Sequence, residues 1–118
     1  MRYFTLDEFD SPDLPGSGAQ MQPEFLAKLD EARHIAGVPF RINSGFRTEA
    51  HNASLYNSSS TSSHLTGWAA DISATTSNRR YLVLSALIRV GFRRIGIADT
   101  FIHVDMDPDK PQNVTWLY

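Results

Sequence analysis

The sequence contains no cysteine. This absence excludes disulfide bonds, thiolate metal ligands and a cysteine nucleophile together. Any metal ion therefore has to be held by nitrogen and oxygen atoms. A chain without thiols also tolerates an environment outside a reducing cytosol.

Long apolar runs and runs of one charge are missing too. No apolar stretch approaches the roughly 18 residues that a membrane-spanning helix needs, so we expect no membrane insertion. The net charge is −2 and the basic residues form no run longer than the pairs at 79–80 and 93–94, so nothing predicts a nucleic-acid partner. Residues 1–8 do not show the pattern of a secretory signal, in which a charged segment is followed by an apolar segment and then by small residues.

What is present is typical of a small globular domain. The chain has 118 residues, of which 42% are hydrophobic and 20% charged. A chain of this length supports one modest core, so we expect one domain over residues 1–118 and a monomer.

Two helices are predicted. The first covers 23–36, because Pro23 suits a first helical residue, apolar residues recur at helical spacing and Gly37 ends the pattern. The second covers about 78–90, with an N-cap at Ser77 or Asn78 and an end at Gly91. It is apolar around most of its circumference, which predicts the main buried helix.

Before the first helix, residues 1–22 predict a short strand or extended arm and then turns rich in proline and glycine. Strands are predicted within 39–43, 68–73, 94–97, 101–106 and 114–117. The serine-rich stretch 57–63 is predicted to be a surface loop beside a site, since a linker there would leave two halves too small to fold. The fold class predicted is α+β, with helices packed on a small antiparallel sheet.

Three residues in these segments suit a metal ion. His64 and Asp71 lie seven positions apart, and alternation in 68–73 puts Asp71 on a face whose small neighbours leave space around its carboxylate. Alternation in 101–106 puts His103 on one face with Phe101 and Asp105. Two histidines and a carboxylate match a catalytic zinc site, in which zinc acts as a Lewis acid and activates water. The alternative is that His64 lies in an ordinary loop and that His103 is a core histidine satisfied by Asp105. His34 is predicted to be a surface residue.

The pattern Ser62-x-His64-x-x-Gly67-x-Ala69-x-Asp71 resembles the first signature of the M15 zinc D-Ala-D-Ala carboxypeptidases and peptidoglycan endopeptidases. The segment 101–105, Phe-Ile-His-Val-Asp, resembles their second signature. Residues 44–48 and 51–53 are similar to their arginine-bearing segment. The resemblance implies the fold shared with hedgehog-type and lysostaphin-related metalloproteins, one zinc ion, and His64, Asp71 and His103 as its ligands.

The resemblance also implies a role for Arg47 in binding a substrate carboxylate or polarising the scissile carbonyl, for which a forked guanidinium is suited. The alternative for Arg47 is a salt bridge with Glu49 or Asp99. Many members carry an acid or a histidine three positions before the last histidine ligand, where this chain has Thr100. Asp105 and Asp99 are the candidates for the general base, and Asp105 alternatively orients His103.

The resemblance implies a zinc peptidase that cleaves peptidoglycan peptides, as a D,D-carboxypeptidase or an endopeptidase. A non-catalytic, zinc-stabilised module that binds cell wall or protein is the alternative, favoured by Thr100. We expect the protein to act on the cell wall, and the lack of a signal favours a phage protein made in the host cytoplasm.

Overall fold

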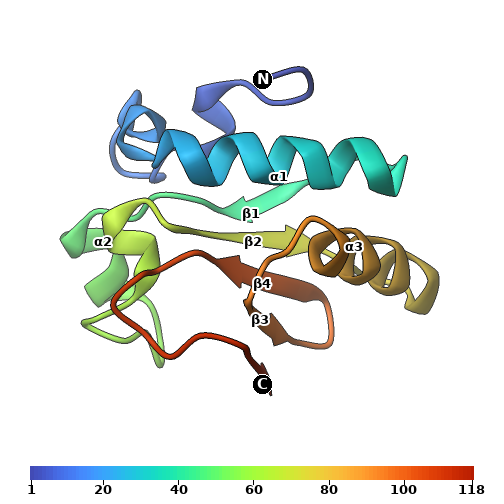
Figure 1. Cartoon of the computed structure of the whole chain (residues 1–118). Coiled ribbons are helices and arrows are strands. Elements are labelled where there is room, and N and C mark those ends of the chain that lie inside the picture. The colour runs from blue at the N-terminus through green and yellow to red at the C-terminus, as the bar shows by residue number, and fades with distance from the viewer.

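The computed structural model describes residues 1–118. The α-helices are α1 (Pro23–Ala36), α2 (Glu49–Ser54) and α3 (Ser77–Arg89), and three short 3-10 turns are η1 (Leu6–Phe9), η2 (Ser17–Gln20) and η3 (Ser63–Thr66). The strands are β1 (Ile42–Ser44), β2 (Ala69–Ser73), β3 (Arg94–Ile97), β4 (Phe101–Asp105) and β5 (Val114–Leu117). Figure 1 shows their arrangement along the chain.

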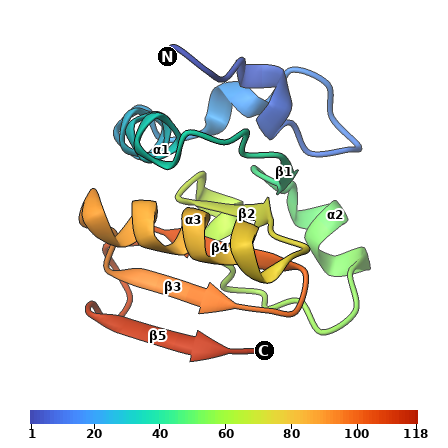
Figure 2. The ribbon, with the colours of Figure 1, turned by 90° about the vertical axis from the view of Figure 1, so that its right-hand side faces the viewer.

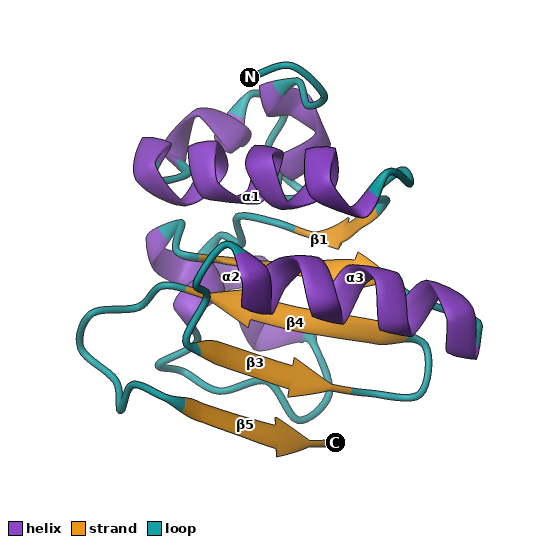
Figure 3. Ribbon diagram, turned by 45° about the vertical axis from the view of Figure 1, so that its right-hand side comes forward, coloured by secondary structure: helices purple, strands orange, loops and turns teal.

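The strands form one sheet in the order β1-β2-β4-β3-β5, which Figure 3 shows from top to bottom. The pairs β1–β2, β2–β4 and β3–β4 are antiparallel, as predicted. The last strand, β5, is parallel to β3, an orientation that the sequence did not indicate. With helices packed against this sheet, the predicted α+β class is confirmed.

Helix α1 begins at Pro23 and ends before Gly37, which adopts a left-handed φ of 69°, so both predicted bounds are confirmed. Helix α3 begins one residue earlier than predicted, because the Thr76 side chain accepts a hydrogen bond from the Arg79 amide and makes Thr76 the N-cap. The two helices pack against each other, and α3 lies across the sheet in Figure 2.

The prediction that residues 78–90 form the main buried helix is wrong. Helix α3 buries three residues, whereas α1 buries five, and Tyr81 and Ile88 of α3 are 69% and 59% exposed. Because α3 is the outer layer on one face of the sheet, only the stripe that faces the sheet and α1 is covered.

No strand forms within residues 1–22, so that part of the prediction is also wrong. The segment folds into η1 and η2 instead, and the Asp10 carboxylate accepts hydrogen bonds from the amides of Gly16 and Gly18. Local side-chain acceptors of this kind satisfy the backbone within turns, which removes the need for a strand partner. The predicted strand at 39–43 is found shifted, at Ile42–Ser44.

Alternation along β2 and β4 gives the sheet two different faces. One face carries Ile72, Ile102 and Val104, which are fully buried in the core with α1 and α3. The opposite face carries Asp71 and His103, which line a pocket. None of the helices is long and apolar enough to cross a membrane.

Candidate metal centre

Three elements bring His64, Asp71 and His103 together. Asp71 on β2 and His103 on β4 are direct partners across the antiparallel pair, so their side chains leave the sheet side by side. His64 comes from η3, whose N-cap Ser62 accepts a hydrogen bond from the His64 amide. The sheet therefore fixes two of the three side chains, and η3 delivers the third.

Gly67 allows η3 to end where it does. Its φ is +77°, and a Cβ atom there would lie 2.3 Å from the carbonyl oxygen of Gln20. Any other residue would meet both a strained backbone and a clash. The glycine of the sequence motif is thus required by the turn that leads from His64 into β2.

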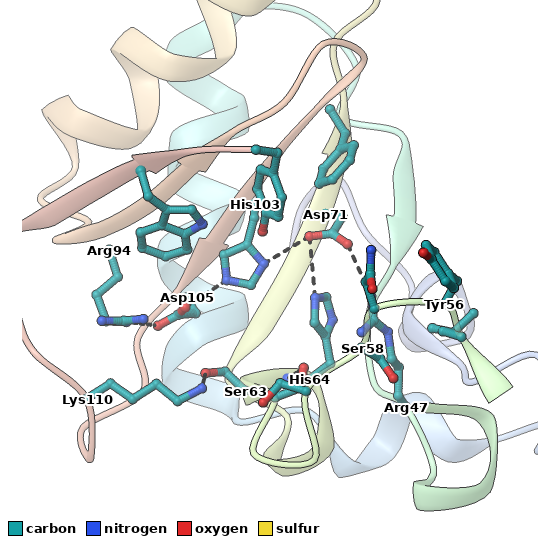
Figure 4. A pocket seen from close by; sticks show the side chains of 17 residues that line it. Arg47, Tyr56, Ser58, Ser63, His64, Asp71, Arg94, His103, Asp105 and Lys110 are labelled. Atoms are coloured by element: carbon teal, nitrogen blue, oxygen red, sulfur yellow. Dashed lines mark hydrogen bonds and ion pairs between the residues drawn. The ribbon is translucent and has the colours of Figure 1, made fainter. Parts of the chain in front are cut away.

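One ring nitrogen of His64 and one of His103 point toward the Asp71 carboxylate, as Figure 4 shows. Asp71 Oδ1 lies 3.0 Å from His103 Nδ1 and 3.4 Å from His64 Nε2. One donor atom from each residue lies within 4.8 Å of the others. Two imidazole nitrogens and a carboxylate oxygen at this spacing fit a zinc ion, since zinc takes these ligands in three-residue sites.

The remaining nitrogen of each histidine has its own partner. His64 Nδ1 lies 2.7 Å from the Gly45 carbonyl oxygen, and His103 Nε2 lies 2.7 Å from Asp105 Oδ2. Because a carbonyl accepts only, Nδ1 of His64 carries a proton, which leaves Nε2 as the atom that can bind a metal ion. His103 has a carboxylate at each ring nitrogen, and a metal ion at Nδ1 would replace its hydrogen bond to Asp71. Both Nε2 of His64 and Nδ1 of His103 face Asp71.

The charges of the cluster follow from its burial and its contacts. Burial acts to raise the pKa of Asp71, but hydrogen bonds from His103 and His64 outweigh it and hold that pKa well below its usual range. Burial acts to lower the pKa of His103, and its contacts with Asp105 and Asp71 reverse this and raise it. The structure thus surrounds an ionised Asp71 with groups that favour positive charge.

Asp105 lies on the far side of His103 from Asp71. It is 1% exposed, and Arg94 Nε donates to its Oδ1 at 2.6 Å while Oδ2 faces His103. Burial acts to raise the pKa of Asp105, and its hydrogen bond with His103 contributes most to lowering it. The sequence alternative that joined Asp105 to His103 matches a contact of the structure, although His103 also contacts Asp71.

Arg47 reaches the same cluster from the chain between β1 and α2. Its Nη2 lies 3.4 Å from Asp71 Oδ2, and its Nε donates to Ser44 Oγ at 3.0 Å. The ion pair expected as the alternative, with Glu49 or Asp99, is not formed, because Asp71 is the carboxylate that the Arg47 side chain meets.

Other predicted residues lie away from the cluster. Asp99 and Thr100 are exposed in the turn between β3 and β4, and neither lines the pocket. His34 is exposed on α1 against the Tyr3 hydroxyl. His51 lies within α2, and its backbone amide donates to Oγ1 of the N-cap residue Thr48.

The pocket around the three donors has a volume of about 460 Å³ and is lined mainly by polar residues. Its rim includes the predicted serine-rich loop, and its other wall comes from β4 and β5. The lining residues are Arg47, Leu55, Tyr56, Asn57, Ser58, Ser59, Ser62, Ser63, His64, Asp71, Arg94, Phe101, His103, Asp105, Lys110, Trp116 and Tyr118.

Several lining residues had no signal in the sequence. Trp116 of β5 packs against His103 with ring centroids 5.5 Å apart and ring planes tilted by 48°. Ser63 donates to Asp107 at 2.7 Å and accepts from Lys110 at 2.9 Å, which ties η3 to the chain after β4. These contacts join residues far apart in the sequence, so no local pattern marks them.

The fold and the site define a class of protein: a small α+β domain in which two histidines and one aspartate that could hold a metal ion lie together in an open pocket. The family model for Peptidase M15 matches residues 2–105, so the chain belongs to this family. Members are peptidases and typically depend on zinc, which agrees with the donor set. No curated protein matches the sequence.

Proposed function

We propose that this protein is a zinc peptidase that hydrolyses a peptide bond in the peptidoglycan stem peptide or cross-link, as a D,D-carboxypeptidase or an endopeptidase. The observation that carries the proposal is the convergence of His64, Asp71 and His103 in an open pocket of a Peptidase M15 chain. We propose these three residues as the zinc ligands. A zinc ion held there would polarise the scissile carbonyl and activate water.

In this proposal Arg47 is the group that binds the substrate. Its guanidinium lies beside Asp71 and lines the pocket. After the contacts with Ser44, Asn52 and Asp71, N–H groups of Arg47 remain to face the pocket. They suit either the oxygen of the scissile carbonyl or a terminal carboxylate. Those two roles correspond to an endopeptidase and a carboxypeptidase.

We propose that Asp105 positions His103 rather than acting as the general base. Both of its oxygens are engaged, Oδ1 by Arg94 Nε and the Asp107 amide and Oδ2 by His103. A base has to reach the reacting water on the pocket side. Asp99, the other sequence candidate, is exposed outside the pocket and is left without a role in this proposal.

A second function is favoured by Thr100, which stands where many relatives carry an acid. A threonine hydroxyl does not accept a proton near neutral pH. The alternative is therefore a non-catalytic, zinc-stabilised module that binds cell wall or protein. In either case we propose that the protein works as a monomer at the cell wall, and a phage protein released through a membrane pore fits that place of action.

One experiment separates these functions. Zinc content and the release of fragments from purified peptidoglycan and D-Ala-D-Ala peptides are measured on wild type, His103→Ala and the matched control His34→Ala, which removes an exposed histidine. The peptidase predicts about one zinc per chain and a defined product, both lost only in His103→Ala. Zinc without any product supports the binding module. A protein that binds no zinc contradicts both.

A further inference from the structure

Asn52 is the buried polar residue of α2. It is 3% exposed, and both ends of its amide are used. Oδ1 accepts from Arg47 Nη1 at 3.2 Å, and Nδ2 donates to the Ser59 carbonyl oxygen at 2.8 Å. Since a guanidinium only donates and a carbonyl only accepts, the amide has one possible orientation. Its backbone carbonyl also accepts from the Ser58 hydroxyl.

The two partners of this amide belong to different parts of the pocket. Arg47 extends from Asn52 to the Asp71 carboxylate at the floor. Ser59 belongs to the rim loop, which we define as residues 55–62 and of which Leu55, Tyr56, Asn57, Ser58, Ser59 and Ser62 line the pocket. One side chain therefore connects the floor to the rim.

The rim loop has few other anchors. Two of its backbone hydrogen bonds, from the Ser58 amide to Leu55 and from the Ser62 amide to Ser59, stay within the loop. The others are at its ends, where the Leu55 amide donates to Asn52 and the Ser62 carbonyl accepts from Leu65. Lys110 donates to the Thr61 carbonyl from the opposite side. Tyr56 at the tip is 94% exposed, so packing does not hold it. Removing the Asn52 amide leaves the hydrogen bond from the Ser58 hydroxyl to the Asn52 backbone carbonyl as the remaining side-chain tether between the first half of the loop and α2.

We propose that Asn52 is a positioning residue that holds the Arg47 guanidinium and the rim loop at a fixed separation, and so sets which peptides the pocket accepts. This inference rests on the proposed peptidase function. In this proposal the peptide binds between Arg47 and the rim loop, which are both held by Asn52. A change at Asn52 therefore alters substrate binding without removing a metal ligand.

The test uses Asn52→Asp, which keeps an acceptor for Arg47 but places a carboxylate oxygen against the Ser59 carbonyl. We expect faster hydrogen exchange over residues 55–62 and unchanged exchange in β2 and β4. We expect KM for a stem peptide to rise about fivefold, the effect of one hydrogen bond, with kcat within about twofold. The matched control is Asn43→Asp, which changes an exposed asparagine of β1 outside the pocket and should leave every value unchanged.

Unchanged exchange of the rim loop, or a loss of kcat with KM unaltered, would overturn the proposal. If Asn52→Asp does not fold, Asn52→Ala is measured in the same way and is expected to free the loop as well. The exchange readout needs no turnover. A wild-type protein that cleaves no peptide would therefore count against the proposed function, while the exchange data still decide whether Asn52 holds the loop.

Discussion

His103 is held at both ring nitrogens, and the two contacts have different consequences. Nδ1 faces Asp71 at 3.0 Å and Nε2 faces Asp105 at 2.7 Å. A carboxylate behind a metal-binding imidazole fixes the ring and makes it a better ligand. Arg94 fixes that carboxylate in turn, and its guanidinium lies 5.1 Å from the Trp116 ring. The orientation of this candidate ligand thus depends on residues of β3 and β5.

At the scale of single residues, we predict that Asp105→Asn weakens zinc binding by about 10- to 100-fold. An asparagine offers one acceptor oxygen where His103 and Arg94 need two, so the ring loses its fixed position. Zinc affinity is measured by competition with a chelator, and activity at saturating zinc should be largely retained. Asp99→Asn is the control and should have no effect. Full zinc affinity with kcat abolished would identify Asp105 as the base and contradict its positioning role.

At the scale of elements, β5 completes the pocket wall because the neighbouring strand β3 has a glycine where aromatic side chains pack. A Cβ atom on Gly96 of β3 would lie 2.5 Å from Trp116 Nε1 and 2.8 Å from Tyr118 Cε2. The two aromatic side chains therefore pack closely against Gly96, and Trp116 contacts His103 while Tyr118 contacts Phe101 on β4. The missing side chain of Gly96 is what lets the edge strand contribute to the site.

We predict that Gly96→Ala destabilises the protein by about 1–3 kcal/mol, because the added methyl group overpacks the aromatic wall. Denaturant unfolding measures the change. A double-mutant cycle with Trp116→Ala tests the cause: the cost of Gly96→Ala should shrink once the indole is gone. Equal costs in both backgrounds would show that contact with Trp116 is not the source.

A second element-scale link ties the N-terminal arm to α1. Asp30 of α1 is buried and accepts from the amides of Arg2 and Tyr3 at 3.0 and 2.9 Å. Burial acts to raise the pKa of Asp30, but these hydrogen bonds lower it below its usual value. A carboxylate with a depressed folded-state pKa stabilises the fold above its unfolded-state pKa, and that stability is lost as pH falls through the folded-state pKa.

We therefore predict that Asp30→Asn lowers the free energy of unfolding by about 1–2 kcal/mol near pH 6. The difference from wild type should begin to shrink below about pH 4, where this carboxylate takes up a proton in the unfolded chain, and should be lost as pH falls through the lower folded-state pKa of Asp30. Denaturant unfolding at several pH values measures it, with the exposed Asp99→Asn as a control. A difference that does not vary with pH would contradict an ionic role for Asp30.

At the scale of the whole molecule, the candidate ligands join η3, β2 and β4, which are separated by most of the second half of the chain. A ligand that binds only the folded state stabilises it in proportion to the logarithm of its concentration over Kd. Zinc should therefore act on global stability as well as on chemistry.

We predict that zinc at about 100 times its Kd adds about 2.7 kcal/mol to the free energy of unfolding and that a chelator removes this gain. Thermal unfolding with and without zinc measures it. His64→Ala should abolish the zinc-dependent rise in Tm, whereas His34→Ala should keep it. A rise that survives in His64→Ala would contradict the proposed ligand set.

Local sequence patterns predicted some features of the structure correctly and could not predict others. Pro23 and Gly37 marked the ends of α1, and alternation in β4 separated His103 from the core residues, because both are properties of neighbouring residues. The parallel pairing of β5 and the burial of α3 depend on which elements meet, which no window of sequence contains. Local sequence also could not predict the proposed role of Asn52, because that role depends on contacts with Arg47 and the rim loop that form only in the folded protein.

The pairing of β2 with β4 also bears on when the site forms during folding. Asp71 and His103 are 32 positions apart, and α3 and β3 fold between them. Closing a loop of that length costs entropy before the contact repays it, so the strand pair is expected to form late. Interactions made after the transition state slow unfolding and leave the folding rate nearly unchanged. A metal ion at this site would then lengthen the lifetime of the folded protein by slowing its unfolding, and would not speed its folding.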